Sequence, residues 1–148
     1  RLKLVHCDFK PHNVLRCKGD KVKVIDFGQT CKVGFGKNRV QGTPDFIAPE
    51  QVKCQAVDEK TDIYSFGASL YWALTGNRVP TYFTVDKKDH DVVKFQEFPS
   101  PMEVNKAIPA DLSKLVMQCL MYSPDRRVAD MITALNALSS SLTAAPRA

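Results

Sequence analysis

Residues 61–76 carry the pattern that most restricts how this chain can fold. Apolar side chains recur there at the spacing of one helical face, at Ile63, Phe66, Leu70 and Leu74. The remaining face is also apolar, with Ala68, Trp72 and Ala73. A helix that is apolar nearly all round has to be surrounded by other elements. The sequence therefore predicts a central helix that begins at Thr61 or Asp62 and ends at Gly76.

Other segments supply the elements around this helix. A helix is expected over 110–121, with a buried stripe of Leu112, Leu115, Val116, Cys119 and Leu120. Another is expected over 128–142, with Val128, Met131, Ile132, Leu135 and Leu142 in register. Two short β-type runs, 14–17 and 22–25, flank turn residues at 18–21 and predict a hairpin. Residues 2–5 could close a helix or begin a strand. The expected fold class is α+β, mainly α.

Composition limits the class of protein. The 148 residues are enough for one domain with a core, and 44% apolar with 25% charged residues is ordinary for a globular protein. The longest apolar runs are far shorter than a membrane span, and the chain opens with no signal-like leader, so we expect a cytoplasmic domain. The five cysteines are scattered without a Cys-x-x-Cys pair, which favours free thiols. The net charge of +5 is spread along the chain, and no nucleic-acid motif accompanies it.

The residues with reactive side chains lie mainly in 6–13 and 26–28, two loops that the predicted hairpin would bring to the same edge of the sheet. An Asp–x–Lys–x–x–Asn set at Asp8, Lys10 and Asn13 is followed by Asp26. Together they offer a proton acceptor, a cation for phosphate charge and two oxygen ligands for a metal, which are the parts that phosphoryl transfer needs. Taken singly, each has a plainer reading: a turn-capping Asp or Asn, or a solvated surface Lys.

Three motifs in order resemble the C-terminal lobe of eukaryotic-type Ser/Thr protein kinases. His6-Cys7-Asp8-Phe9-Lys10-Pro11-His12-Asn13 matches the catalytic loop, 26–28 reads Asp-Phe-Gly, and 48–50 reads Ala-Pro-Glu. The similarity covers nearly all of the chain, and the motif sequences look similar to those of bacterial members of the family. It implies a kinase-like helical lobe with short hairpins at the cleft, in a partial domain over 1–142. Within that domain it implies an activation segment over 26–50 and a helical subdomain over 61–142, followed by a flexible tail over 143–148.

The resemblance also implies roles for individual residues. Asp8 would be the catalytic base, Lys10 would neutralise the transferred phosphoryl group, and Thr43 would contact both the base and the substrate. The ATP site would draw on Lys10, Asn13, Leu15 and Asp26, with Leu15 beneath the adenine. Asn13 and Asp26 would bind Mg2+. The implied partners are ATP and protein substrates that carry Ser or Thr.

Structural roles follow from the same resemblance. Asp62 would accept backbone N–H groups of the catalytic loop, although a plain helix N-cap is the alternative. Glu50 would form a buried ion pair with Arg127, or with the neighbouring Arg126. His6 and Phe27 would stack within a hydrophobic spine. The glycine-containing segment 29–47, with its basic residues, is expected to be a mobile loop.

The chain departs from the family at Cys7, where an Arg that pairs with an activation-segment phosphate is usual. A thiol cannot form that pair, and the hydroxyls in the activation segment are Thr30 and Thr43 alone. We therefore expect control that does not depend on activation-segment phosphorylation, and a redox-sensitive Cys7 near Cys31 is a further possibility. Motifs of the N-terminal lobe are absent from these residues, so we expect a fragment that is inactive by itself. A pseudokinase or docking module is the alternative function.

Overall fold

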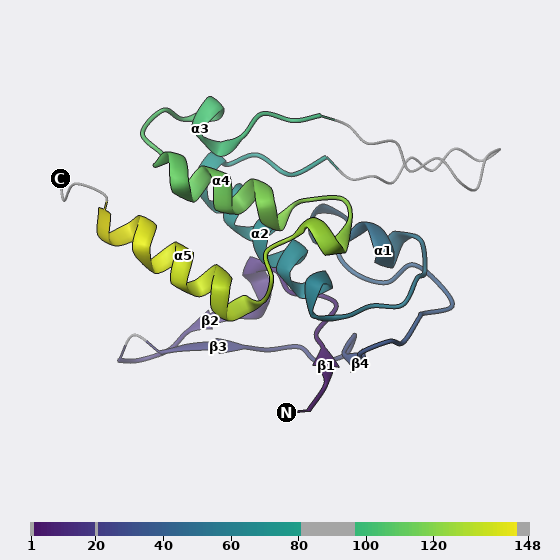
Figure 1. Ribbon diagram of the computed structural model, residues 1–148. Helices are drawn as coiled ribbons and strands as arrows, with labels where there is room; N and C mark the ends of the chain where they lie inside the picture. The colour runs from purple at the N-terminus through teal and green to yellow at the C-terminus, as the bar shows by residue number, and fades with distance from the viewer. Residues whose placement is uncertain (1, 20, 81–96, 145–148) are drawn as a thin grey trace.

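A computed structural model describes residues 2–19, 21–80 and 97–144 of the chain (Figure 1). The helices are α1 (Pro49–Val52), α2 (Glu59–Thr75), α3 (Pro101–Val104), α4 (Ala110–Cys119) and α5 (Met131–Ala144). The strands are β1 (Leu4–Val5), β2 (Val14–Arg16), β3 (Val22–Val24) and β4 (Cys31–Lys32). Short 3-10 helices are η1 (Pro11–Asn13), η2 (Pro44–Phe46) and η3 (Pro124–Arg126). The mixed but mainly helical content agrees with the expected α+β class.

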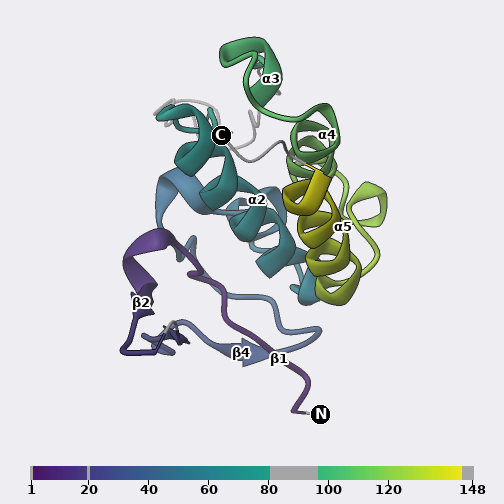
Figure 2. The ribbon, with the colours of Figure 1, turned by 90° about the vertical axis from the view of Figure 1, so that its left-hand side faces the viewer.

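Helix α2 lies at the centre of the described structure, as the sequence predicted. It contacts β1, η2, α3, α4 and η3, and Figure 2 shows it between the strands and the C-terminal helices. Its N-cap is Asp58, whose Oδ1 accepts a hydrogen bond from Lys60 N at 2.8 Å. The predicted start at Thr61 or Asp62 was wrong, because both of those side chains bond to other segments. The predicted end was right: Gly76 is left-handed, with φ of 72°, and its N–H donates to Trp72 O.

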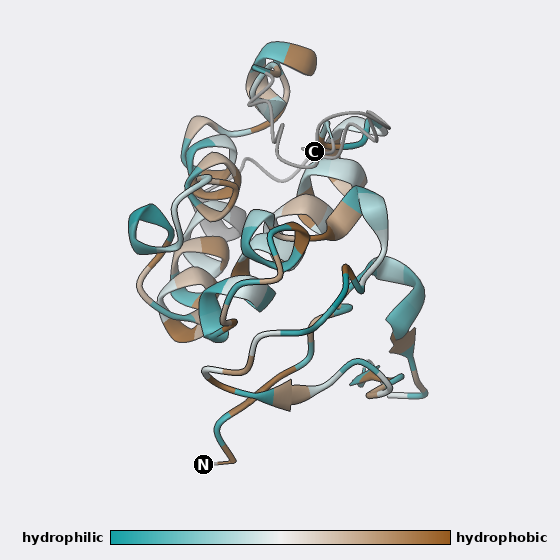
Figure 3. Cartoon of the chain, turned by 90° about the vertical axis from the view of Figure 1, so that its right-hand side faces the viewer, coloured by the Kyte–Doolittle hydropathy of each residue, from teal (hydrophilic) through white to brown (hydrophobic). Residues whose placement is uncertain are grey.

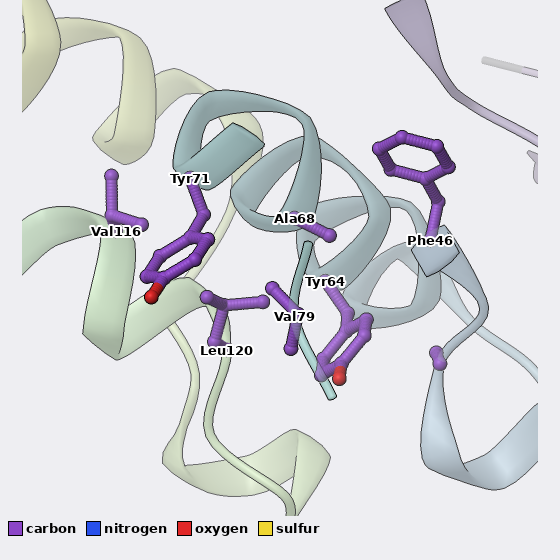
Figure 4. Packing of buried hydrophobic residues seen from close by; sticks show 8 residues of the cluster. Phe46, Tyr64, Ala68, Tyr71, Val79, Val116 and Leu120 are labelled. Atoms are coloured by element: carbon purple, nitrogen blue, oxygen red, sulfur yellow. The ribbon is translucent and has the colours of Figure 1, made fainter. Parts of the chain in front are cut away.

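The main core forms where α2 meets α4 and the chain before α1. Its buried members are Phe46, Ala48, Tyr64, Ala68, Tyr71, Val79, Val116 and Leu120 (Figure 4). A second cluster joins the other side of α2 to α4 and α5 through Ile63, Leu115, Cys119 and Ala134. The predicted stripe on α4 is confirmed, since Leu112, Leu115, Val116, Cys119 and Leu120 are all buried. The C-terminal end of α2 is less buried than its centre, and Trp72 there is 39% exposed.

Helix α5 packs through a different face from the one expected. Ala134 is fully buried, whereas Ile132 and Leu135 are 54% and 57% exposed, and Met131 is exposed as well. Hydrophobic residues occupy much of the circumference of this helix, so their spacing alone does not select the packed face. In Figure 3, hydrophobic and hydrophilic segments alternate along the helices of the described structure. The small Ala134 allows the close approach to α4. The helix also starts later than predicted, at Met131, because Asp130 Oδ1 accepts a hydrogen bond from Thr133 N at 2.7 Å.

The end of α5 extends past the predicted boundary at residue 142 and includes residues 143 and 144. The rest of the expected tail, 145–148, and the Leu142 side chain lie outside the described residues. Residues 81–96 lie outside them too. Helix α3 follows this gap and begins with a capping box: Ser100 N and Oγ both donate to Glu103 Oε2 at 2.7 Å.

Two small antiparallel pairs position the loops of the site. Strands β2 and β3 pair in the register Val14↔Val24 to Arg16↔Val22, which confirms the predicted hairpin, although Asp20 in its turn lies outside the described residues. Strands β1 and β4 pair in the register Val5↔Cys31, which resolves the N-terminal run as a strand. The segment 29–47, which was expected to be a mobile loop, contains the short elements β4 and η2. Among the described residues, no helix has the length and hydrophobicity to cross a membrane.

Candidate active site

The loop at residues 6–13 is held from below by the first turn of α2. The two carboxylate oxygens of Asp62 accept hydrogen bonds from the backbone N–H groups of His6, at 2.8 Å, and Cys7, at 3.0 Å. Burial raises the pKa of Asp62 above its usual value, and the two backbone hydrogen bonds act in the opposite direction. The expected anchoring of the loop by Asp62 is confirmed, and the N-cap alternative is excluded.

Asp8, Lys10 and Thr43 meet in one hydrogen-bonded set at the end of this loop. Lys10 Nζ donates to Asp8 Oδ2 at 3.0 Å and to Thr43 Oγ1 at 2.7 Å. The Thr43 hydroxyl in turn donates to Asp8 Oδ1 at 2.8 Å. The two charged side chains are still reachable, with 10% of Asp8 and 20% of Lys10 exposed. A carboxylate so placed can accept a proton from a substrate hydroxyl, beside an ammonium group that can stabilise developing negative charge.

Asn13 and Asp26, the two predicted metal ligands, are brought together by the β2–β3 hairpin. Ile25 N donates to Asn13 O at 2.9 Å, which puts Asp26 one residue from the Asn13 backbone. Asn13 is buried and its Nδ2 donates to Asp8 O at 3.0 Å, so its Oδ1 is the atom left to bind a cation. Asp26 has a left-handed φ of 63°, a conformation that is uncommon outside glycine and is concentrated at functional sites.

The Asp26 side chain lies at the surface: Asp26 is exposed, and so is every residue of β3. Its Oδ1 accepts a hydrogen bond from Gly28 N at 3.3 Å. Burial therefore gives no reason for a metal at Asp26, and the case depends on the oxygen donors that the hairpin brings together.

The donor set suits Mg2+ held jointly with a nucleotide. In the described part of the chain, no cluster of three or more His, Cys, Asp or Glu side chains could hold a metal by itself. Magnesium in nucleotide sites typically takes one or two protein oxygens and completes its coordination with phosphates and water. Asn13 and Asp26 match that requirement. Leu15, the residue predicted to lie under the adenine, is 46% exposed on β2 and is free to contact a ligand.

The structure also brings together residues whose structural roles were expected. His6 and Phe27 are in contact, with ring centroids 5.2 Å apart, but their planes are tilted by 54° instead of stacked, and Phe27 is 64% exposed and is not a core residue here. Arg127 forms a two-pronged ion pair with Glu50, at 2.7 Å and 2.8 Å, which confirms Arg127 over Arg126. Thr61 Oγ1 donates to the same carboxylate at 2.8 Å.

Gln51 is a residue of the site that the sequence did not reveal. Its buried Nε2 donates to Cys7 O at 2.8 Å and to Gln41 O at 3.2 Å, and its Oε1 accepts from Ala48 N. Gln51 thereby joins the residue before Asp8 to the segment that leads to Thr43. A glutamine after Ala-Pro-Glu looks like an ordinary surface residue in sequence, and no spacing rule marks it.

A hollow lies beside Lys10 and Thr43 of the reactive set. It has a volume of about 430 Å3 and is lined by Lys10, Asn13 and Thr43, together with Phe46, Trp72 and the ion pair of Asp45 with Arg78. An opening of this kind next to Asp8 leaves room for a polypeptide side chain to approach the carboxylate.

Comparison with known proteins agrees with this geometry. The protein kinase domain model matches residues 1–141. A probable serine/threonine-protein kinase of Clostridium acetobutylicum is 35% identical over 93% of this chain. Serine/threonine-protein kinase A of Synechocystis is 34% identical over 97%, and serine/threonine-protein kinase PksC of Streptomyces coelicolor is 37% identical over 84%. The chain spans 21% to 30% of the length of these relatives. On its sequence and its motifs alike, the chain belongs to the protein kinase domain family.

Proposed function

We propose that this chain is the catalytic lobe of a serine/threonine-protein kinase, which transfers the γ-phosphate of ATP to Ser or Thr hydroxyls of proteins. The observation that carries the proposal is the set formed by Asp8, Lys10 and Thr43, with the Thr43 hydroxyl 2.8 Å from Asp8 Oδ1. The names of the relatives support the same activity. The free cysteines among the described residues are compatible with a cytoplasmic domain, which is the location we propose.

In this mechanism Asp8 orients the substrate hydroxyl and takes its proton as the bond to phosphorus forms. Lys10 stabilises negative charge on the group in transfer, and its second hydrogen bond, to Thr43, fixes its direction. Asn13 and Asp26 would hold Mg2+, which when bound neutralises phosphate charge. Leu15 would support the adenine. The buried contacts of Asp62 and Gln51 keep Asp8 in place between the two sides of the site.

We further propose that this lobe works together with an ATP-binding lobe encoded elsewhere in the same protein. The sequence has no Gly-rich phosphate loop and no strand with the usual kinase lysine, and both are needed to hold ATP. Leu15, Val22 and Phe27 leave large apolar surfaces exposed beside the catalytic loop, and a second lobe would cover them. The isolated chain should then be inactive.

We also propose that activation-segment phosphorylation is not the switch of this kinase. Thr43 Oγ1 is already bonded to Asp8 and Lys10, and Thr30 Oγ1 is buried. Neither hydroxyl is presented to another kinase, and Cys7 supplies no cation to bind a phosphate.

The substitution Asp8→Asn in the full-length protein tests the proposed function. It keeps the shape of the side chain but removes the base, so we expect kcat for phosphoryl transfer to a Ser/Thr peptide to fall about 100-fold or more. Binding of ATP should change little. Asp111→Asn, an exposed residue in the first turn of α4, is the matched control and should leave kcat unaltered.

Two outcomes would count against the proposal. Unreduced transfer in Asp8→Asn would overturn the role of Asp8. An unmodified full-length protein that binds ATP but transfers no phosphate to a peptide library would favour the alternative of a pseudokinase or docking module.

A further inference from the structure

We propose that Cys7 and Cys31 form a modification site, at which a hydroperoxide oxidises the two thiols to a reversible disulfide. The bond would link the residue before Asp8 to strand β4 of the activation segment. This inference goes beyond the proposed phosphoryl transfer, and its test does not depend on that activity.

The two sulfur atoms are already in contact. Cys7 Sγ and Cys31 Sγ are 3.6 Å apart, and both belong to a cluster with Val5 and Val57. The pairing of Val5 with Cys31 in the β1–β4 ladder sets the backbone of one cysteine beside the start of the catalytic loop. A disulfide needs the sulfurs at about 2.05 Å. The remaining movement of about 1.5 Å is within the range of side-chain rotation.

The backbone around Cys7 is held in a way that favours this contact. Cys7 has a left-handed φ of 64°, its N–H donates to Asp62 Oδ1, and its carbonyl accepts from Gln51 Nε2. These bonds fix the backbone of Cys7, and its buried side chain packs among Val5, Val57 and Cys31.

The two cysteines differ in their access to solvent. Cys7 is 1% exposed, whereas Cys31 is only half-buried and lines a hollow of about 450 Å3 together with Thr30, Lys37 and Arg39. Burial, followed by the neighbouring Cys31, raises the pKa of the Cys7 thiol to about 12, so Cys7 reacts poorly with an oxidant in solution. An oxidant that enters the hollow meets Cys31 first.

The chemistry follows in two balanced steps. The Cys31 thiol attacks one oxygen of hydrogen peroxide, which breaks the O–O bond, gives Cys31 sulfenic acid and releases water. The Cys7 sulfur then attacks the sulfenic sulfur, its proton leaves with the hydroxyl as a second water, and the S–S bond forms. Two thiols are oxidised by two electrons and one peroxide is reduced. A dithiol such as dithiothreitol reverses the bond.

The test uses the full-length protein treated with a small excess of hydrogen peroxide, blocked with N-ethylmaleimide and digested with trypsin without reduction. Cys7 lies in the tryptic peptide Leu4–Arg16, because the Lys10–Pro11 bond resists trypsin, and Cys31 lies in Val24–Lys32. Each peptide contains a single cysteine. We expect mass spectrometry to find these two peptides linked, and to find them separate after dithiothreitol treatment.

Variants test the order of the two steps. Cys7→Ser should leave Cys31 as a sulfenic acid that dimedone labels, because the second sulfur is missing. Cys31→Ser should leave Cys7 reduced and unlabelled, because peroxide cannot reach it. Cys54→Ser, which changes another half-buried cysteine, is the matched control and should link the two peptides as the unmodified protein does.

The proposal fails if the unmodified protein shows no linked peptide while peroxide oxidises other cysteines. It also fails if Cys31 proceeds to sulfinic acid with Cys7 still a thiol, because that would mean the second sulfur does not reach the first. The proposal would also be contradicted if the Cys7–Cys31 disulfide formed in Cys54→Ser while the unmodified protein formed a different disulfide.

Discussion

At the scale of single residues, the two threonines of the activation segment have opposite environments. Thr43 Oγ1 takes part in hydrogen bonds with both Lys10 and Asp8, at 2.7 Å and 2.8 Å. Thr30 Oγ1 is buried and, within the described structure, has no hydrogen-bond partner. A buried hydroxyl without a partner costs stability, whereas one that bridges two charged groups orients them. The same substitution at the two positions should therefore have opposite consequences.

Thr43→Val removes the bridge while keeping the side-chain shape, so we expect kcat to fall about 10- to 100-fold in peptide phosphorylation by the full-length protein. Thr43→Ser keeps the hydroxyl and should restore most of the rate. Thr30→Val is the matched control: kcat should be unaltered and the free energy of unfolding should rise slightly, since no hydrogen bond is lost. A Thr30→Val protein as impaired as Thr43→Val would contradict this assignment, and also the proposed independence from activation-segment phosphorylation.

Residue-scale prediction from the sequence succeeded where the chemistry is local. Asp8, Lys10 and Asn13 lie within six residues, so one loop is bound to bring them close. Thr43 lies 35 residues from Asp8, and only the family resemblance pointed to it. Gln51 and the partners of its amide could not be found at all, because a single sequence does not say which polar side chain is buried by tertiary packing.

At the scale of elements, the close approach of α2 and α4 depends on Gly67. A Cβ built on Gly67 would lie 2.5 Å from the Cβ of Cys119, a separation that two side chains cannot share. The glycine costs some helix propensity in the middle of α2, and it allows the second core cluster to close.

Gly67→Ala should accordingly destabilise the protein, by about 1–3 kcal/mol, through overpacking against α4. The measurement is the midpoint of urea unfolding at constant m-value. Ala73→Ser adds one atom at an exposed position of the same helix and should change the free energy of unfolding by no more than about 0.5 kcal/mol. A Gly67→Ala protein more stable than the unmodified protein would show that helix propensity, rather than the contact with Cys119, governs this position.

Element-scale prediction found the three longer helices α2, α4 and α5, missed the four-residue helices α1 and α3, and was less reliable for packed faces. The apolar stripe of α4 is narrow, and it chose the correct face. The sequence of α5 offers apolar residues on several sides, and tertiary contact selected small Ala134 over the larger Ile132 and Leu135. The starts of α2 and α5 were also misplaced. Asp58 caps α2 and Asp130 caps α5, whereas the sequence predicted starts at Thr61 or Asp62 and at Val128.

At the scale of the whole molecule, Arg127 ties the C-terminal helices to the end of the activation segment. Its guanidinium pairs with both oxygens of Glu50 and also donates to the carbonyls of Lys60, Met121 and Tyr122. The Arg127 side chain is fully buried and that of Glu50 is 6% exposed. A buried pair of this kind gives little net stability relative to apolar replacements, but removing one partner is costly because it leaves the other charge unpaired.

Arg127→Met should lower the free energy of unfolding by about 3–5 kcal/mol, because it leaves the Glu50 carboxylate buried without a cation. Adding Glu50→Gln to Arg127→Met should recover part of that loss, since it removes the unpaired charge. Urea unfolding of the two variants measures the difference. A double variant less stable than Arg127→Met alone would show that Glu50 is stabilised by Thr61 and other neighbours rather than by Arg127. Arg126→Met is the matched control and should cost much less, because Arg126 is exposed.

This long-range tie has a consequence for synthesis on the ribosome. Glu50 and Arg127 are 77 residues apart, so at about 5–20 residues per second the activation segment emerges several seconds before the arginine that fixes its end. Throughout that interval Glu50 has no Arg127 to pair with, so we expect its carboxylate to stay hydrated. Completion of the C-terminal helices is thus the step at which the buried tie between Glu50 and Arg127 can form, and we expect a chain that stalls before Arg127 to lack it.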